Sequence, residues 1–316
     1  MPKLKNIEEK YINGIKVDKE NSCVFFNDET HKYYDKETMQ EYVSVTTLIH
    51  NYTQEFNEEF WSFYKALEMF LEPEIFYPVK KTLLATKKVN KKLIKKLNLN
   101  EEEFLAKQEE IKAEYARKRE ESCTRGTNIH AIFENSFYGK THFDFTKFGY
   151  KDLVGDFICN ENYYKLDLEK GVYPEFLISV ASKDNILRVS GQIDLLVIDG
   201  NDVTIMDWKT NKSIDKTSYY DKSKKSNVMM KYPLDNLQDC NFNHYQLQLS
   251  LYAYMLQQIN PEYNIKSLKI VHIDHDNKQH EYECEYLKKD VERMLKHYKK
   301  QIKVKQELEK LKPVIC

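Results

Sequence analysis

The sequence predicts an α/β protein with a central mixed β-sheet flanked by helices. Two apolar runs, residues 193–198 and 203–208, are joined by Asp199-Gly200-Asn201-Asp202, which is typical of a tight turn. A third apolar run, residues 176–180, precedes them and follows Pro174-Glu175. Helical periodicity lies on both sides of these strands, so helices are available to cover a sheet.

The other elements are expected in chain order around this hairpin. Asn100 with Glu103 three residues later marks a helix start, because this spacing allows an N-terminal cap. The remaining expected elements are a hairpin at 23–34, a strand or strand-to-helix entry at 42–49, helical patterns at 57–71, 79–98 and from 100 towards 138, a helix at 243–256, a strand at 267–275 and a basic helix at 286–311.

The hairpin register decides which side chains meet. If Asp199 pairs with Asp202, Asp194 lies opposite Asp207, with Cβ atoms about 5 Å apart. A loop two residues shorter keeps both carboxylates on one face, whereas a loop of odd length separates them. We expect the shared face.

Asp207 and Lys209 are two residues apart on one strand and point the same way, while Trp208 points to the opposite face and can pack in a core. Two carboxylates in an apolar sheet repel each other unless a cation joins them, and oxygen ligands suit Mg²⁺ or Mn²⁺. Lys209 would then orient or deprotonate a water, or neutralise charge on a phosphate. The plainer alternative is an Asp207–Lys209 ion pair at a strand end.

Two helical segments carry further candidates. Arg125 and His130 lie in Arg-Gly-Thr-Asn-Ile-His, beside an apolar stripe, so His130 taken alone is a packing residue. In the segment 243–256, Tyr245, Gln248 and Tyr252 share one helix face.

The ordered set Glu175, Asp194 and Asp207-Trp208-Lys209 resembles the signature of the PD-(D/E)XK nuclease superfamily, with its restriction-endonuclease-like core. Arg125-Gly-x-x-x-His130 and Gln248-x-x-x-Tyr252 extend the resemblance, over about residues 125–256, to its RecB-like and lambda-exonuclease-like branch.

The resemblance implies a role for each residue. Asp194, Asp207, His130 and the backbone carbonyl of Trp208 would hold a metal, Glu175 would position water or a second ion, and Lys209 would activate the nucleophile. Gln248 and Tyr252 would touch DNA or brace the lysine, with Arg125 and Tyr245 as DNA-binding or supporting residues.

The implied function is that of a DNA nuclease dependent on Mg²⁺ or Mn²⁺. We expect an exonuclease acting on single-stranded DNA or duplex ends in replication, recombination or repair, of the stand-alone type found in phages or in mitochondrial DNA maintenance. A helicase, recombinase or single-strand-binding protein would be its partner. The alternatives are a structure-specific or restriction-type endonuclease, or a non-catalytic nucleic-acid-binding protein that retains the fold.

Missing motifs and the cysteine spacing exclude several cofactors and metal centres from the expected function. A phosphate-loop motif is missing, so no nucleotide is expected, and the six cysteines show no C-x-x-C spacing, so neither an iron–sulfur cluster nor a zinc ribbon is expected. No signal peptide or apolar run of membrane-spanning length is present, which predicts an intracellular protein without a membrane partner.

The chain is expected to form a single nuclease domain over residues 1–316. Between Val79 and Asn98 stand eight lysines and no acidic residue, which predicts either phosphate contact or a solvated helix face. The basic segment 216–231 is expected to be a mobile loop near the active-site mouth.

The parts of the domain are an amino-terminal β element (1–55), a helical lysine-rich segment (56–120), a nuclease core (121–275) and a carboxy-terminal strand and helix (276–316).

Overall fold

The computed structural model describes residues 10–12, 15–17, 24–27, 30–137, 152–153, 168, 170–222 and 224–311. The chain divides into two compact units. We call them the core unit (Met1–Gln54, Asn128–Tyr220 and Asn227–Cys316) and the helical unit (Glu55–Thr127 and Asp221–Ser226). That both units serve one nuclease domain stays a prediction.

The core unit is built on a nine-stranded mixed sheet, which confirms the predicted fold class. Most neighbouring strands run antiparallel, but β12 is parallel to β9, β5 to β8 and β6 to β7. The strands, in sheet order, are β13 (Gln279–Cys284), β12 (Asn264–Ile273), β9 (Asp202–Lys209), β8 (Arg188–Asp199), β5 (Glu41–Ser44), β4 (Lys32–Asp35) and β3 (Val24–Asn27), with β7 (Gly171–Ser182) also on β8 and β6 (Asp152–Leu153) on β7. A separate pair, β1 (Lys10–Ile12) and β2 (Ile15–Val17), lies nearer the amino terminus.

The predicted hairpin register is confirmed. Asp199 pairs with Asp202, and the ladder continues to Leu195 opposite Met206. Gly200 has φ 64, a conformation that costs glycine little and suits a tight turn. The hydrogen-bonded ladder ends one pair before Asp194 and Asp207 would face each other.

Two different strands, β5 and then β9, pair with successive parts of the same edge of β8. β7 pairs with β8 from Arg188 to Ile198, so β5 and β9 must share the other edge. On that edge β5 pairs at Val189 and Ser190, and β9 pairs from Leu195 onwards. Between these two ladders lie residues 191–194, so Asp194 stands where the neighbouring strands change.

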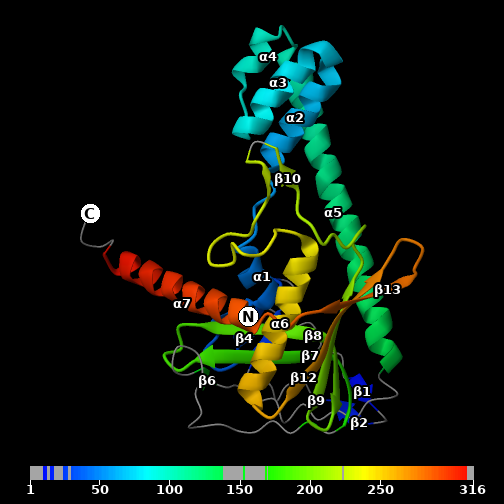
Figure 1. The fold of residues 1–316 in the computed structure, drawn as a ribbon, viewed down its shortest axis with the longest axis vertical. Helices are drawn as coiled ribbons and strands as arrows, with labels where there is room; N and C mark the ends of the chain where they lie inside the picture. The colour runs from blue at the N-terminus through cyan, green and yellow to red at the C-terminus, as the bar shows by residue number, and fades with distance from the viewer. Residues whose placement is uncertain are drawn as a thin grey trace. The chain divides into compact units, whose positions relative to one another are not determined.

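Three helices cover one face of the sheet: α1 (Val45–His50), α6 (Asn241–Ile259) and α7 (Lys288–Leu311). Ser44 caps α1, because its side chain accepts a hydrogen bond from the Thr47 amide. Figure 1 shows α6 lying over the strands, and its buried Leu and Met side chains join Leu196 and Ile198 of β8 in the main core. The expected helices at 243–256 and 286–311 are thus present.

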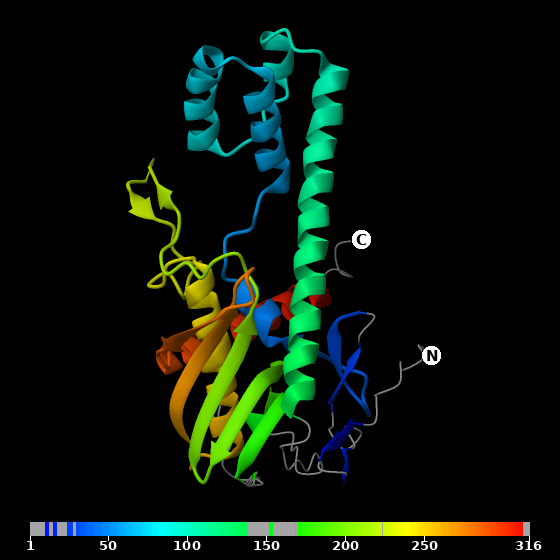
Figure 2. The same cartoon turned by 90° about the vertical axis from the view of Figure 1, so that its right-hand side faces the viewer.

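The other face holds a smaller apolar cluster. Leu195 of β8, Trp208 of β9 and Val271 of β12 pack there with Ile129 and Phe133 from the end of α5 (Glu101–Phe137). The rings of Phe133 and Trp208 are stacked, with centroids 5.0 Å apart. Figure 2 shows the last turns of α5 beside the strands. Trp208 therefore packs in a core, as predicted.

The helical unit contains α2 (Glu58–Phe70), α3 (Pro73–Thr86), α4 (Lys92–Lys96) and the first part of α5. Asn57 caps α2 through the Phe60 amide, and Asn100 accepts hydrogen bonds from the Glu102 and Glu103 amides, so the predicted start of α5 is confirmed. The helical pattern expected at 79–98 is interrupted, because Lys87 adopts a left-handed conformation, φ 49, and ends α3.

The segment 216–231 contains more regular structure than its sequence indicated. Two short strands, β10 (Tyr220–Asp221) and β11 (Ser226–Asn227), pair with each other, and the Val228 amide donates to the Tyr219 carbonyl at 3.0 Å. Its mobility and its place at the active-site mouth stay predictions.

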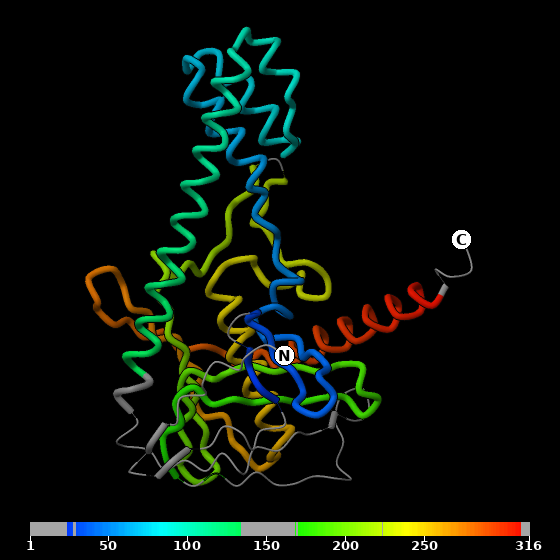
Figure 3. The backbone as a smooth tube through the Cα atoms, turned by 180° about the vertical axis from the view of Figure 1, so that it is seen from behind, coloured from blue at the N-terminus to red at the C-terminus, as the bar shows by residue number. Residues whose placement is uncertain are grey.

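Helix α7 leaves the sheet towards the carboxy terminus (Figure 3). From 303 to 310 every residue is exposed. None of the helices in the described ranges combines the length and the apolar character needed to cross a bilayer.

Candidate active site

Asp194 of β8 is a buried carboxylate at the change of neighbouring strands. Its Oδ2 accepts a hydrogen bond from the Trp208 amide at 2.7 Å, so the side chain takes a backbone donor that continued β8–β9 pairing would otherwise use. Burial and the nearby Asp207 raise the pKa of the Asp194 carboxyl well above its usual range, against the opposing effect of His130.

Glu175 lies on β7 in an unusual backbone conformation. Its neighbours Pro174 and Phe176 pair with Leu195 and Ile193, so Glu175 is at the register position opposite Asp194. Its φ is 49, in the left-handed region that L residues rarely adopt inside a strand. Such a conformation costs on the order of 1–3 kcal/mol and tends to persist where surrounding structure enforces it, as at functional sites.

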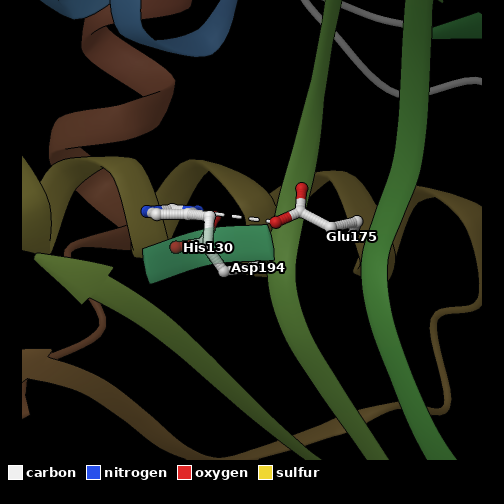
Figure 4. Close-up of side chains that lie close together, drawn as sticks. All are labelled: His130, Glu175 and Asp194. Atoms are coloured by element: carbon white, nitrogen blue, oxygen red, sulfur yellow. Dashed lines mark ion pairs between the residues drawn. The ribbon is translucent and has the colours of Figure 1, made fainter. Parts of the chain in front are cut away.

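His130, near the end of α5, points towards both carboxylates (Figure 4). Its Nδ1 lies 3.4 Å from Glu175 Oε1 and 3.6 Å from Asp194 Oδ1. Its Nε2 lies 3.1 Å from the Trp208 carbonyl oxygen, which can only accept, so Nε2 carries a proton. His130 therefore contacts polar groups as well as the apolar stripe, and its role as a metal ligand stays a prediction.

The electrostatics of this corner favour a cation. Burial alone lowers the pKa of His130, but Asp194 and Glu175 outweigh it and raise the pKa to about 9. With Nε2–H directed at a carbonyl, Nδ1 faces the carboxylates, which is the usual orientation of a histidine prepared for a ligand.

One side-chain group in the described ranges has the geometry to hold a metal ion. It consists of His130, Glu175 and Asp194, whose ligand atoms lie within 4.8 Å of one another. Two carboxylate oxygens and one imidazole nitrogen suit a divalent cation of the Mg²⁺ or Mn²⁺ kind, with the nitrogen favouring manganese. These residues therefore fit the predicted metal.

Asp207 and the Trp208 carbonyl, which were also expected to be ligands, are placed differently. Asp207 lies outside the group of three, and the Trp208 carbonyl accepts the His130 hydrogen bond. The Trp208 carbonyl oxygen has a second lone pair that could still bind an ion. The ligand roles of Asp207 and of this carbonyl stay predictions.

Asp207 is held by two side chains. Gln248 of α6 donates from Nε2 to Asp207 Oδ1 at 3.0 Å, and Lys209 Nζ forms an ion pair with Oδ2. Asp207 is 1% exposed, so these contacts take the place of water.

Lys209 keeps its proton in this environment. Burial lowers its pKa, but Asp207 and Asp194 outweigh burial and raise the pKa above its ordinary value. Its Nζ also lies 4.8 Å from the centre of the Tyr245 ring, a cation–π contact. This arrangement favours charge neutralisation or orientation of a water over proton abstraction by Lys209.

Tyr252 is buried behind the site. It is 3% exposed and packs so closely on Gly191 that a Cβ at Gly191 would lie 2.8 Å from Tyr252 Cε1. Gln248 is also buried, and whether these two residues touch DNA or brace the lysine stays a prediction.

Two residues near the site were missed from the sequence. Gly191 provides the space for Tyr252, and Tyr33 of β4 is buried where Glu175 and Asp194 act on it electrostatically. Neither belongs to a motif, and only the long-range pairing of β5 with β8 brings β4 near Asp194. Arg125 is half-buried on α5 within the helical unit, so its link with the site stays a prediction.

Comparison with known families agrees with this geometry. The family model of the PD-(D/E)XK nuclease superfamily matches residues 47–313. The chain belongs to this superfamily. Nucleases of the PD-(D/E)XK superfamily use divalent metals, so membership supports a metal-dependent nuclease, and the mixed sheet with flanking helices agrees with its fold.

Other comparisons add little to the PD-(D/E)XK assignment. The solved crystal structure of SSO0001 is similar at 18% identity with a TM-score of 0.25, over 42% of this chain and 50% of that one. The chain thus spans about half the length of that protein. No curated protein was found to match.

Proposed function

We propose that this chain is a deoxyribonuclease of the RecB-like and lambda-exonuclease-like branch, using Mg²⁺ or Mn²⁺ to act as an exonuclease on single strands or duplex ends. The observation that carries the proposal is the position of His130, whose Nδ1 faces Glu175 and Asp194. His130 is the last residue of the Arg-Gly-x-x-x-His motif, and this motif resembles the RecB-like and lambda-exonuclease-like branch in particular.

The side chains have distinct parts in this function. Asp194, Glu175 and His130 would hold the ion, with Asp207 contributing next to them. When bound, the ion supplies Lewis-acid polarisation of the scissile phosphate. The Lys209 ammonium neutralises charge that develops on the phosphate, and Gln248 keeps Asp207 oriented.

The two units serve one nuclease in this proposal, with DNA as substrate. A helicase, recombinase or single-strand-binding protein is the kind of partner that delivers ends to such an enzyme. Replication, recombination or repair, in a phage or in organelle DNA maintenance, is the corresponding setting.

The test is cleavage of end-labelled linear single-stranded, linear duplex and circular DNA with magnesium, manganese or EDTA. The double variant Asp207→Ala/Lys209→Ala is the inactive control. We expect metal-dependent shortening of linear DNA while circles stay intact.

Other outcomes select among the alternatives. Cut circles would move the chain to the structure-specific or restriction-type endonucleases. Binding of DNA without cleavage in either metal would overturn the enzyme in favour of a non-catalytic binding protein.

A further inference from the structure

The helical unit carries a strongly basic surface that the proposed active site does not use. Its centre is the segment from Val79 to Asn98, where eight lysines occur without an acidic residue. Leu83 of α3 and Ile94 of α4 are buried, whereas seven of these lysines are exposed and Lys80 is half-buried. The apolar residues thus pack inwards and the charges face outwards.

A second basic segment is brought to the same unit from far along the chain. Residues 221–226 cluster with the helical unit, and Asp221 Oδ2 lies 3.7 Å from Lys87 Nζ at the end of α3. This short segment contributes Lys222, Lys224 and Lys225, all exposed. The fold therefore gathers like charges from two distant segments, which repel each other unless an anion compensates them.

The neighbouring helix α5 shows what an ordinary solvated charged face looks like in this unit. Each of its cations from 107 to 119 meets a carboxylate within 4.0 Å. The pairs are Lys107–Glu110, Lys112–Glu59, Arg117–Glu121, Lys118–Glu114 and Arg119–Glu58.

The lysines of α3 and α4 differ from those of α5. Lys87 and Lys95 have a carboxylate within 4.0 Å, at 3.7 and 3.8 Å, but Lys88, Lys92 and Lys96 have none in the described ranges. Lys95 and Lys96 also lie in the last turn of α4, where a helix dipole favours cations, but this does not explain Lys88, Lys222, Lys224 or Lys225.

We propose that this basic surface of the helical unit, residues 80–96 with Lys222, Lys224 and Lys225, binds the phosphate backbone of DNA. It rests on the proposed function, since the ligand is the substrate of that active site. Flexible ammonium groups without carboxylate partners suit sequence-independent contact with a polyanion, and their binding releases counterions. The surface supplies affinity for the strand, whereas the carboxylates of the core unit supply the chemistry.

The test is fluorescence anisotropy with a labelled DNA oligonucleotide in EDTA, at several salt concentrations, so that no cleavage is needed. The variants are Lys88→Gln/Lys92→Gln/Lys96→Gln and Lys222→Gln/Lys224→Gln/Lys225→Gln. The matched control, Lys107→Gln/Lys118→Gln/Lys266→Gln, removes the same charge from ion-paired positions.

We expect each test variant to weaken binding by about tenfold or more and to reduce the salt slope by about one unit per lysine in contact. The control should bind like the parent chain, and arginine at 88, 92 and 96 should restore affinity. Unchanged binding in both test variants, an equal loss in the control, or binding to anionic vesicles without binding to DNA would overturn the inference.

This test is independent of the active site. If the parent chain cleaves DNA but the lysine variants bind DNA as well as the parent chain, the nuclease proposal holds and the proposal of a DNA-binding basic surface fails. If DNA binding depends on these lysines but no DNA is cleaved, the basic surface holds and the nuclease proposal fails.

Discussion

The Asp194 carboxylate accepts the backbone N–H of Trp208 at 2.7 Å and so joins β8 to β9 just beyond the end of their ladder. One carboxyl group thus has a structural role, in which Oδ2 holds the strand, and a proposed chemical role, in which Oδ1 faces His130. Substitutions at Asp194 can separate these two roles.

Asp194→Asn and Asp194→Ala should both abolish metal-dependent cleavage. Their stabilities should differ, because asparagine can still accept the Trp208 N–H, whereas alanine leaves this buried donor unpaired at a cost of about 1–3 kcal/mol. Urea unfolding of both variants measures the difference. Equal stability would contradict a structural role for Oδ2.

Gln248→Leu should reduce cleavage by about 10- to 100-fold, since Asp207 loses its buried hydrogen-bond donor. The free energy of unfolding should also fall by about 1–3 kcal/mol. Gln258→Leu on the same helix is the matched control. Gln258 is 4% exposed against 7% for Gln248, but its Oε1 accepts no hydrogen bond in the described part of the chain, so leucine there should be neutral or stabilising. Similar losses in both variants would refute a specific role for Gln248.

Gly191→Ala should destabilise the fold by about 1–3 kcal/mol, because the new Cβ would approach Tyr252 Cε1 to 2.8 Å and the Tyr252 hydroxyl to 2.9 Å. In a Tyr252→Leu background the same substitution should cost much less. A double-mutant cycle of unfolding free energies measures this coupling, and additive effects would show that Tyr252 does not limit the space at Gly191.

Asp184 fixes α7 to the turn between β7 and β8, with its carboxylate 3.0 Å from Lys299 and 3.3 Å from Lys303. Burial alone raises its pKa, but hydrogen bonds from Ser182 and Lys299 outweigh burial and hold the pKa far below its ordinary value. A depressed folded-state pKa stabilises the fold above the unfolded value near 4, and this stability is lost as pH falls towards the folded value.

Asp184→Asn should therefore lower the melting temperature at pH 7, by an effect of about 1 kcal/mol or less since the pairs are partly exposed. The difference from the parent chain should shrink below about pH 4. Asp276→Asn, at a carboxylate whose side chain is 79% exposed, is the control and should change little at either pH. A constant difference across this pH range would show that the charge of Asp184 is not the cause.

The local features of the fold could be predicted because neighbouring residues determine them. The turn at Gly200 fixes the β8–β9 register, and the caps Asn57 and Asn100 fix two helix starts. The position of Asp207 and Lys209 on one strand follows from the same short-range rules.

Features that depend on distant contacts could not be predicted in this way. The parallel pairing of β5 with β8, which brings Tyr33 towards the carboxylates, joins segments more than 140 residues apart. A helical pattern of lysines and leucines likewise does not reveal that α3 ends at Lys87 or that the chain divides into two units.

If Glu175 acts in the proposed metal site, its left-handed backbone sets stability against activity. Glycine adopts this conformation without strain, so selection for thermal stability alone would favour glycine there. That replacement would remove one of the three side chains able to surround a cation. Under the proposed function, retaining glutamate at an unfavourable φ is a conformational cost of the chemistry, and random mutagenesis screened only for heat resistance should yield stable, inactive proteins altered at this position.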